Sequence, residues 1–419
     1  MVQIDDSYVM NHTCIRVKDP KVSVPFYERN FGMKLLQKFA FDSFTLYMLA
    51  IDDGSNVNWA AREGVLELTH NHGTENDPDY TVNNGNGEKD RGFGHICFSV
   101  DNIEAAQTRL LGDDVRFQKK LTDGRQKNIA FALDPDGYWI ELIEHGKDKK
   151  EGTTDPASYR LNHSMIRVKD ASKSLDFYRK ALGMKLFKKK EFEAAKFTLY
   201  FLGYDHGSTI PEGEEPPSKQ ALQQGILELT HNWGTENDPK FKGYHNGNST
   251  ENGAKQGYGH ICVACKDPAA FCKNIENEFG DSVQWSVKWN QGKMKNLAFI
   301  RDPDGYSIEI IPSDIMVTDA TKTKVNNLIK EHPVVIFSKD YCPYCTKTKS
   351  TISALTDSAY ILEINTIPDG AEIQDYLFEI SQQRTVPNVY INGQHVGGNS
   401  DVQELKSQGK LDGLLKAAL

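Results

Sequence analysis

Apolar and polar positions along residues 1–312 predict a regular succession of short strands and helices. His12–Val17 and Gly64–Thr69 are expected to be strands, and Val22–Gly32 (VSVPFYERNFG) is expected to be a helix that ends at its glycine. Asn102–Leu111 predicts a second helix. The order strand, helix, strands occurs twice in each half of this region. Each half is therefore expected to contain two βαβββ modules.

An internal repeat is the dominant feature of the same region. Four blocks return in the same order, namely HTCIRVKDP and HSMIRVKDA (from His12 and His163), LELTHNHGTENDP and LELTHNWGTENDP (from Leu66 and Leu227), GFGHIC and GYGHIC (from Gly92 and Gly257), and DPDGYWIEL and DPDGYSIEI (from Asp134 and Asp302). A shared order of four blocks indicates duplication of a whole domain.

Three segments interrupt or flank the repeats. Ser208–Leu222 (STIPEGEEPPSKQAL) is a longer, Pro- and Glu-rich loop than its counterpart near Asn56 and is expected to be a surface insertion. Gly146–Ser158 and Ser313–Lys324 are expected to be linkers, and the repeat does not return after the second one. The expected domains are residues 1–150, 151–315 and 316–419.

Composition narrows the classes of partner and compartment. The formal net charge is −9, and Lys and Arg are dispersed among acids, so no nucleic-acid partner is expected. The acidic segment Met1–Met10 does not resemble a secretory signal, and no apolar run approaches the roughly 18 residues of a membrane span. Seven cysteines are an odd number, which favours a reducing, cytoplasmic location over a disulfide framework.

Candidate ligands emerge when residues two apart in a strand are grouped by face. The sets that share a face are His12, Cys14 and Arg16; Glu67, Thr69 and Asn71; His95 and Cys97; Trp139 and Glu141; and, in the second half, His163 and Arg167; Glu228 and Asn232; His260 and Cys262; Ser307 and Glu309. His70 and His72 fall on the face opposite Glu67 and are weaker candidates.

Two imidazoles and two carboxylates suit an octahedral divalent ion that keeps positions open for water or substrate, and nickel, zinc and cobalt all fit. A single histidine in such a position is more often a buried structural residue. Recurrence of all four positions in both halves favours the metal over that alternative.

These residues resemble a known family. His12 with Arg16, the ELTHN segment at Glu67, GFGHI at His95 and DPDGYWIE at Glu141 are similar to glyoxalase I of the vicinal oxygen chelate superfamily, in its fused two-repeat form. The resemblance implies an α+β fold of four βαβββ modules and two metal sites that each combine both repeats. The implied ligands are His12, Glu67, His260 and Glu309 in one site, and His163, Glu228, His95 and Glu141 in the other. Both repeats carry histidine where zinc-using members carry glutamine, which leaves the metal open.

The same resemblance implies the chemistry. The substrate would be the hemithioacetal of methylglyoxal and glutathione, and the metal would stabilise the enediolate formed when C1 loses its proton. Glu309 in one site and Glu141 in the other would move that proton to C2, giving S-D-lactoylglutathione. Glu67 and Glu228 could serve the other substrate epimer.

Glutathione is anionic, and the residues that match the family's glutathione contacts are unevenly shared between the two sites. Arg16 with Asn71 and Arg167 with Asn232 occur in both repeats, whereas Arg91 and Lys119 are replaced by Gln256 and Val287 in the second half. We therefore expect two unequal sites.

The last hundred residues carry a different motif. Val334–Ser338 predicts a buried strand, and after Lys339 the sequence Cys342-Pro343-Tyr344-Cys345 opens a helix, where the helix dipole and the lysine favour a thiolate on the first cysteine. The second cysteine would resolve the mixed disulfide. A zinc site is the alternative, but only His332 and His395 could complete it in this domain.

Together with TVP at Thr385 and GGNSD at Gly397, the CPYC motif is similar to dithiol glutaredoxins, which implies an α/β thioredoxin fold over residues 317–419. The residue before a cis proline would pair with the glutathione backbone. The residues implied to surround glutathione are Val386, Pro387, Lys339, Tyr344, Gln383, Ser400 and Asp401.

Three alternatives remain open. Extradiol dioxygenases and thiol transferases use the same fold as glyoxalase I, and the repeats could be a catalytically silent binding module of a glutaredoxin. The expected partners are the hemithioacetal, glutathione and glutathionylated proteins, and a monomer is expected because fused repeats complete each other's sites.

One hypothesis for the fusion is that the glutaredoxin removes glutathione from Cys14, Cys97 or Cys262. Cys262 with Cys265 also forms a CxxC, which is expected to be pocket wall and core.

Overall fold

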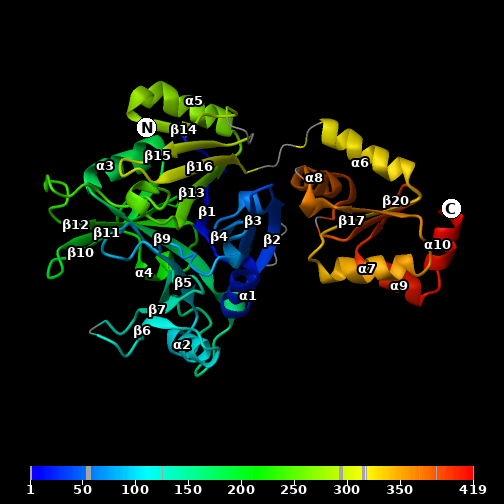
Figure 1. Ribbon diagram of the computed structural model, residues 1–419, viewed down its shortest axis with the longest axis horizontal. Coiled ribbons are helices and arrows are strands. Elements are labelled where there is room, and N and C mark those ends of the chain that lie inside the picture. Colours follow the sequence, from blue (N-terminus) through cyan, green and yellow to red (C-terminus); the bar gives the residue numbers. More distant parts are fainter. Residues whose placement is uncertain are drawn as a thin grey trace. The chain divides into compact units, whose positions relative to one another are not determined.

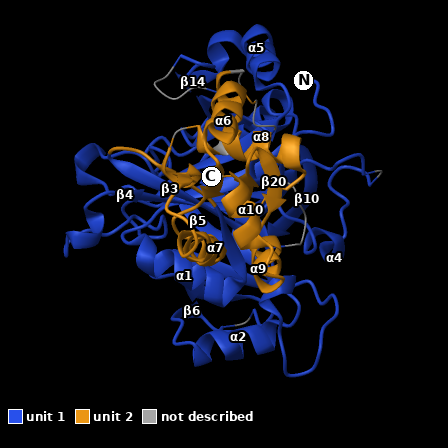
Figure 2. Cartoon of the chain, turned by 90° about the vertical axis from the view of Figure 1, so that its right-hand side faces the viewer, with its two compact units in different colours: residues 1–36, 43–314 blue, residues 37–42, 315–419 orange. Residues whose placement is uncertain are grey.

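The computed structural model describes residues 2–52, 58–124, 126–208, 210–291, 296–313, 317, 319–367, 369–383 and 385–418. It divides into two compact units, coloured separately in Figure 2. Unit 1 comprises Met1–Leu36 and Ser43–Asp314, and unit 2 comprises Gln37–Asp42 and Ile315–Leu419. Both sequence repeats, apart from Gln37–Asp42, therefore fall in one unit.

The first repeat contains two βαβββ modules. Its elements are β1 (Val9–Arg16), α1 (Pro20–Phe31), β2 (Met33–Ala40), β3 (Phe44–Ile51) and β4 (Val65–Asn71), then β5 (Phe93–Val100), α2 (Ile103–Gly112), β6 (Phe117–Lys119), β7 (Ala130–Leu133) and β8 (Trp139–Glu144). The helix of the first module ends where expected because Gly32 adopts φ 68°, which favours glycine.

The second repeat repeats this order. Its elements are β9 (Arg160–Val168), α3 (Ala171–Asp176) continued by η4 (Phe177–Ala181), β10 (Lys185–Phe192), β11 (Phe197–Gly203), α4 (Pro217–Gln220) and β12 (Ile226–Asn232), then β13 (Tyr258–Cys265), α5 (Pro268–Phe279), β14 (Gln284–Val287), β15 (Ala298–Arg301) and β16 (Ser307–Pro312). The short helix α4 lies within the loop that is longer in this repeat.

Two eight-stranded sheets exchange modules between the repeats (Figure 1). One sheet has the order β14-β15-β16-β13-β1-β4-β3-β2, and the other has the order β10-β11-β12-β9-β5-β8-β7-β6. The antiparallel pairs β1 with β13 and β5 with β9 join a module of one repeat to a module of the other. Each sheet is therefore half first repeat and half second repeat.

A single apolar cluster serves both sheets. It includes Ile15 on β1 and Phe98 on β5, and Phe93 stacks on Tyr258 with ring centroids 5.0 Å apart. The repeated DPDGY turn supports this core, since buried Asp134 accepts hydrogen bonds from the Tyr27 hydroxyl and from the backbone N–H of Tyr138. Packing of this kind fixes both sheets around their shared strands.

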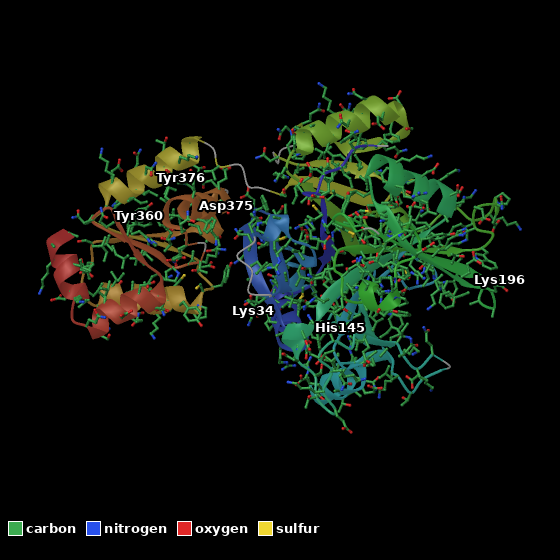
Figure 3. All side chains as sticks on the ribbon, turned by 180° about the vertical axis from the view of Figure 1, so that it is seen from behind. Lys34, His145, Lys196, Tyr360, Asp375 and Tyr376 are labelled. Atoms are coloured by element: carbon green, nitrogen blue, oxygen red, sulfur yellow. The ribbon has the colours of Figure 1, made fainter. Side chains whose placement is uncertain are left out.

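The second unit holds a four-stranded sheet of order β18-β17-β19-β20. Its elements are α6 (Asp319–Glu331), β17 (Val334–Ser338), α7 (Pro343–Ser353), β18 (Ala359–Glu363), α8 (Gly370–Ser381), β19 (Asn388–Ile391), β20 (Gln394–Gly397), α9 (Asn399–Ser407) and α10 (Leu411–Ala418). Helices α6 and α8 meet where the Asn326 side chain donates to the hydroxyl of Tyr376, which is labelled in Figure 3. The predicted α+β fold class, with a C-terminal thioredoxin-type domain, is confirmed.

Within the described ranges, no helix combines the length and the apolar character needed to cross a membrane.

Candidate metal centres and thiol site

The first cluster of candidate ligands combines β1 and β4 of the first repeat with β13 and β16 of the second. His12, Glu67, His260 and Glu309 each present one ligand atom, and these atoms lie within 4.8 Å of one another. The Nε2 atom of His12 is 3.2 Å from a carboxylate oxygen of Glu67 and 3.2 Å from one of Glu309. Two imidazoles and two carboxylates therefore converge on one point.

The second cluster repeats this arrangement with His95, Glu141, His163 and Glu228. The Nε2 atom of His163 is 3.1 Å from a carboxylate oxygen of Glu141 and 3.1 Å from one of Glu228. The ligand grouping proposed from the sequence thus corresponds to two sets of side chains that the structure brings together. Such a donor set fits a divalent ion with open coordination positions.

Strand register explains why the four residues of a cluster meet. Cys14 on β1 pairs with Glu67 on β4 and with His260 on β13, so the three side chains form one row on one face. In the other sheet, Cys97 pairs with both Glu141 and His163. A sulfur side chain therefore lies between a histidine and a glutamate in each row.

Burial and mutual charge dominate the protonation of the first cluster. Burial alone would raise the pKa of Glu67, but its hydrogen bond with His12 and the charges of His260 and His12 lower that pKa to about 2. Burial alone would lower the pKa of His260, but Cys14 and the carboxylates of Glu309 and Glu67 raise it to about 10. Without a cation, the imidazoles therefore balance the buried carboxylates by holding protons.

Sequence reasoning missed the residues that orient two of the histidines. The Nδ1 atom of His12 is 2.7 Å from Oδ1 of Asn11, and the Nδ1 atom of His163 is 2.8 Å from Oδ1 of Asn162. Because an amide oxygen can only accept, Nδ1 carries the proton and Nε2 is left free for a metal. The signal was present in the sequence, since Asn precedes His in both repeats.

The second cluster opens into a cavity of about 870 Å³. Its wall includes the aromatic residues Phe131, Trp139 and Phe201. Pro217, Gln220 and Ala221 of the inserted segment also line it, although that segment was expected to be a surface loop. The insertion reaches the site because Asn162, which supports His163, donates to the backbone carbonyls of Gln220 and Gln223.

The expected glutathione contacts lie at different places in this cavity. Arg91, Arg167 and Asn232 line it, and Asn232 donates to the hydroxyl of Tyr244. Arg167 is held by the Asn86 side chain at 2.9 Å. Lys119 instead donates to the carbonyls of Gln126 and Ile129, at 2.7 and 2.5 Å.

In the first repeat, Arg16 is held in the equivalent way to Arg167, since it donates to Oδ1 of Asn248 at 2.8 Å. Asn71 is the last residue of strand β4, two positions after Thr69 and on the same face. His70 and His72 turn away from the cluster. His70 pairs with Glu75 at 2.8 Å, and His72 lies 2.8 Å from the Thr45 hydroxyl.

The thiols beside the clusters do not fit the hypothesis that they accept glutathione. Cys97 and Cys262 have no exposed surface, and burial raises the pKa of each thiol to about 12. Cys14 is 3% exposed. Cys265 is also buried, as expected for core filler. Burial therefore argues against self-repair at these cysteines, because a thiol without access to solvent is a poor nucleophile.

The second unit contains a separate thiol site. Cys342 is the N-cap of α7, and its sulfur accepts a hydrogen bond from the backbone N–H of Cys345 at 3.3 Å. Burial raises the pKa of the Cys345 thiol to about 12, and that residue has no exposed surface. The outer cysteine thus lies at a helix N-terminus and the inner one is buried.

The residues expected to hold glutathione come from several elements of the second unit, and Val386 lies next to Cys342. The Val386–Pro387 peptide bond is cis, and the Val386 carbonyl lies 3.7 Å from the Cys342 sulfur. Gln383 donates to the Pro387 carbonyl at 2.8 Å, and Tyr344 is 64% exposed. Lys339 directly follows β17, while Ser400 and Asp401 lie in the first turn of α9, where Asp401 accepts from the N–H of Gly398.

Comparisons with known proteins agree with this geometry. The family model of the Glyoxalase/Bleomycin resistance protein/Dioxygenase superfamily matches residues 9–142 and 160–310, and the glutaredoxin family model matches residues 334–396. Glyoxalase I of Saccharomyces cerevisiae is 52% identical over 321 residues, which cover 74% of this chain and 94% of the relative. The lactoylglutathione lyase of Schizosaccharomyces pombe is 45% identical over 311 residues, covering 73% of this chain and 96% of the relative.

The crystal structure of glyoxalase I from Zea mays superimposes with a TM-score of 0.52 at 26% identity, covering 73% of this chain and 93% of that one. The chain belongs to the Glyoxalase/Bleomycin resistance protein/Dioxygenase superfamily. Within that superfamily it is a two-repeat glyoxalase I, and it carries a glutaredoxin domain at its C-terminal end.

Proposed function

We propose that this chain converts the hemithioacetal of methylglyoxal and glutathione into S-D-lactoylglutathione at two metal sites, and that its C-terminal domain reduces glutathione mixed disulfides. The observation that carries the first part is the pair of His₂Glu₂ clusters, each assembled from both repeats. The names of the two yeast relatives support the same activity.

The two carboxylates of each cluster transfer the proton for different epimers of the substrate. Glu309 in the first site and Glu141 in the second take the proton from C1 of the hemithioacetal and return it to C2. Glu67 and Glu228 do the same for the other epimer. All four carboxylates are buried, which suits an exchange that must be shielded from water.

Two histidines and two glutamates would hold each ion. The first site would use His12, His260, Glu67 and Glu309, and the second would use His95, His163, Glu141 and Glu228. When bound, a divalent ion supplies Lewis-acid stabilisation of the negative charge that develops as the proton leaves. Nickel, zinc and cobalt all suit this donor set.

Cationic and amide side chains hold glutathione at the rim. Arg16 with Asn71 serve the first site, and Arg167 with Asn232 and Arg91 serve the second. Lys119 acts at the second site indirectly. Its ammonium group donates to two backbone carbonyls and so stabilises the loop to which they belong.

In the C-terminal domain, the Cys342 thiolate attacks the disulfide and Cys345 resolves the mixed disulfide that results. The glutathione moiety is bound by Lys339, Tyr344, Gln383, Val386, Pro387, Ser400 and Asp401. Glutathionylated proteins are the proposed clients. The chain works as a monomer in the reducing cytoplasm. Its domains are residues 1–150, 151–315 and 316–419.

Thioester formation from methylglyoxal and glutathione tests the lyase. Turnover is measured on purified protein before chelation, after chelation, and after nickel, zinc or cobalt is added back singly. Loss on stripping with recovery by one ion supports the proposal and identifies the metal. Absence of turnover with every ion, while mixed disulfides are still reduced, would leave a glutaredoxin that carries a silent glyoxalase-like binding module.

A further inference from the structure

The last residue of strand β17 carries a buried hydroxyl group. Ser338 has no exposed surface, and among the residues that the structure describes its Oγ atom has no hydrogen-bond partner of normal geometry. Buried hydroxyl groups in proteins are nearly always hydrogen-bonded, so an unpartnered one requires a reason. An alanine at this position would avoid the cost of burying the group, which makes a purely structural role for the hydroxyl weak.

The alternation of side chains along β17 directs Ser338 toward helix α7. Phe337 packs in an apolar cluster with residues of α6 and α8, whereas Ile336 packs in a second cluster with Ile352 of α7. Because side chains two apart in a strand share a face, Ser338 lies on the face of Ile336. Figure 1 shows α7 and α9 on one side of β17 and α6 and α8 on the other.

Helix α7 turns Cys345 toward the same face of the sheet. Cys345, Thr348 and Ile352 are spaced by three and four residues, and none of them has exposed surface. Residues at this spacing lie on one side of a helix, so Cys345 points from the first turn of α7 toward the sheet. Ser338 at the end of the strand and Cys345 at the start of the helix therefore face each other.

Two hydrogen-bond donors adjoin the Cys345 sulfur. Burial raises the pKa of the Cys345 thiol to about 12, while the backbone N–H of Lys339 and the hydroxyl of Ser338 act to lower it. Hydrogen bonds to a charged acceptor are roughly twice as strong as those to a neutral one, so both donors favour the thiolate over the thiol. The two donors belong to consecutive residues, which fixes their positions relative to each other.

Resolution of a mixed disulfide on Cys342 requires negative charge at this buried sulfur. The Cys345 thiol gives its proton to water, its sulfur bonds to the Cys342 sulfur, and the bond from Cys342 to glutathione breaks. Glutathione leaves as a thiolate and takes a proton from water. The two electrons that reduce the glutathione sulfur come from Cys345, so the step needs no further reactant. Because water does not reach Cys345, the charge must be stabilised by neighbouring protein groups.

We infer that the Ser338 hydroxyl rotates to donate a hydrogen bond to the Cys345 sulfur as negative charge develops there, and that it stabilises this thiolate together with the N–H of Lys339. The inference rests on the proposed function in that it takes the glutathione mixed disulfide on Cys342 as the substrate of the step. Opening of the Cys342–Cys345 disulfide receives the same help, since Cys345 is then the leaving group. Ser338 therefore changes the rates in both directions and leaves the equilibrium between neutral dithiol and disulfide as it is.

Rapid mixing of the reduced full chain with a glutathionylated peptide, followed by acid quenching and mass spectrometry, measures how fast the Cys342 adduct forms and decays. The five cysteines of the repeats are buried, and peptide mapping confirms that the adduct is on Cys342. The test variant is Ser338→Ala. The matched control is Thr348→Val, which removes another buried hydroxyl from the same interface, one that donates to Asn399 at 3.1 Å.

Ser338→Ala should slow decay of the adduct about tenfold, as expected for the loss of one hydrogen bond to a charged group, and should leave adduct formation unchanged. Thr348→Val should resolve the adduct at the original rate. The reduction potential of the Cys342–Cys345 couple at pH 7 should be the same in Ser338→Ala, whereas a general distortion of the site would shift it. Unchanged decay in Ser338→Ala, equal slowing of formation and decay, or an equal effect of Thr348→Val overturns the inference.

Opening of the oxidised protein by dithiothreitol separates this inference from the proposed function, because that reaction needs no glutathione. An unsubstituted chain that forms no adduct, together with opening that is about tenfold slower in Ser338→Ala, refutes the glutathione activity and upholds the role of Ser338. An adduct that forms and resolves normally, with opening and resolution both unaffected in Ser338→Ala, refutes only the inference.

Discussion

Asn162 accepts a hydrogen bond from Nδ1 of His163 at 2.8 Å, while its own amide group donates to the carbonyls of Gln220 and Gln223. One side chain therefore sets the tautomer of a candidate metal ligand and holds the loop that precedes β12. Asn11 does the same for His12 through the carbonyls of Trp59 and Arg62.

Removal of this support should weaken the second metal site. We expect Asn162→Ala to lower its metal affinity about 10- to 100-fold, because His163 loses the partner that fixes its ring and its tautomer. Competition with a chromophoric chelator measures the effect. Asn11→Ala, which removes the equivalent partner of His12 in the first site, is the matched control and should leave the second site unchanged. Equal affinity in the alanine variant would show that the hydrogen bond does not orient the ligand.

The two lyase sites should differ in substrate affinity. Glu309→Gln leaves the second site, which has Arg91, and Glu141→Gln leaves the first, which has Gln256 at the Arg91 position. The Glu309→Gln enzyme should show a KM about three- to tenfold lower than the Glu141→Gln enzyme. Steady-state kinetics on metal-loaded protein makes this comparison. Equal KM values in the two variants would refute unequal sites.

Metal binding should stabilise the fold more at high pH than at low pH. The pKa of His260 is raised to about 10 in the metal-free cluster, so its imidazolium stabilises the metal-free fold below about pH 6.5, and this contribution is lost as the pH rises toward 10. A metal must displace those protons, so its affinity increases with pH. The Tm difference between loaded and stripped protein should therefore widen from about pH 6 to about pH 9. A difference that stays constant over this range would contradict proton displacement.

The two cysteines of the C-terminal domain should differ in their effect on mixed-disulfide reduction. Cys342→Ser removes the thiol at the N-terminus of α7 and should reduce the rate by about two orders of magnitude or more. Cys345→Ser removes a buried thiol whose pKa is raised to about 12, and should leave substantial activity on glutathionylated peptides. A coupled assay with glutathione reductase follows both. Comparable losses in the two variants would argue against these roles.

Local patterns in the sequence predicted much of this structure. Gly32 marked a helix end that its positive φ confirms, and positions two apart on a strand correctly placed Trp139 and Glu141 on one cavity wall. The recurrence of four blocks predicted the modules, and the resemblance supplied their exchange between repeats.

What escaped prediction depends on contacts between distant segments. Asn162 reaches carbonyls about 60 residues ahead, and Lys188 lines the cavity of the second cluster only because β10 is the outer strand of a sheet whose register no local pattern specifies. The inserted segment lies at the surface as predicted, but its pairing with β10 was not predicted, for the same reason. Its Pro- and Glu-rich composition is typical of a surface loop, yet its backbone pairs with β10.

The central claim is that each metal site combines both repeats, and metal stoichiometry in two double variants tests it most directly. In the structure, His12 and His260 share one cluster, whereas His12 and His95 belong to different clusters. The His12→Ala, His260→Ala protein should therefore keep one ion and the turnover of the second site. The His12→Ala, His95→Ala protein should bind no ion tightly and should lose turnover. The opposite result, with the second variant retaining an ion and the first losing both, would mean that each repeat builds its own site and would contradict the account.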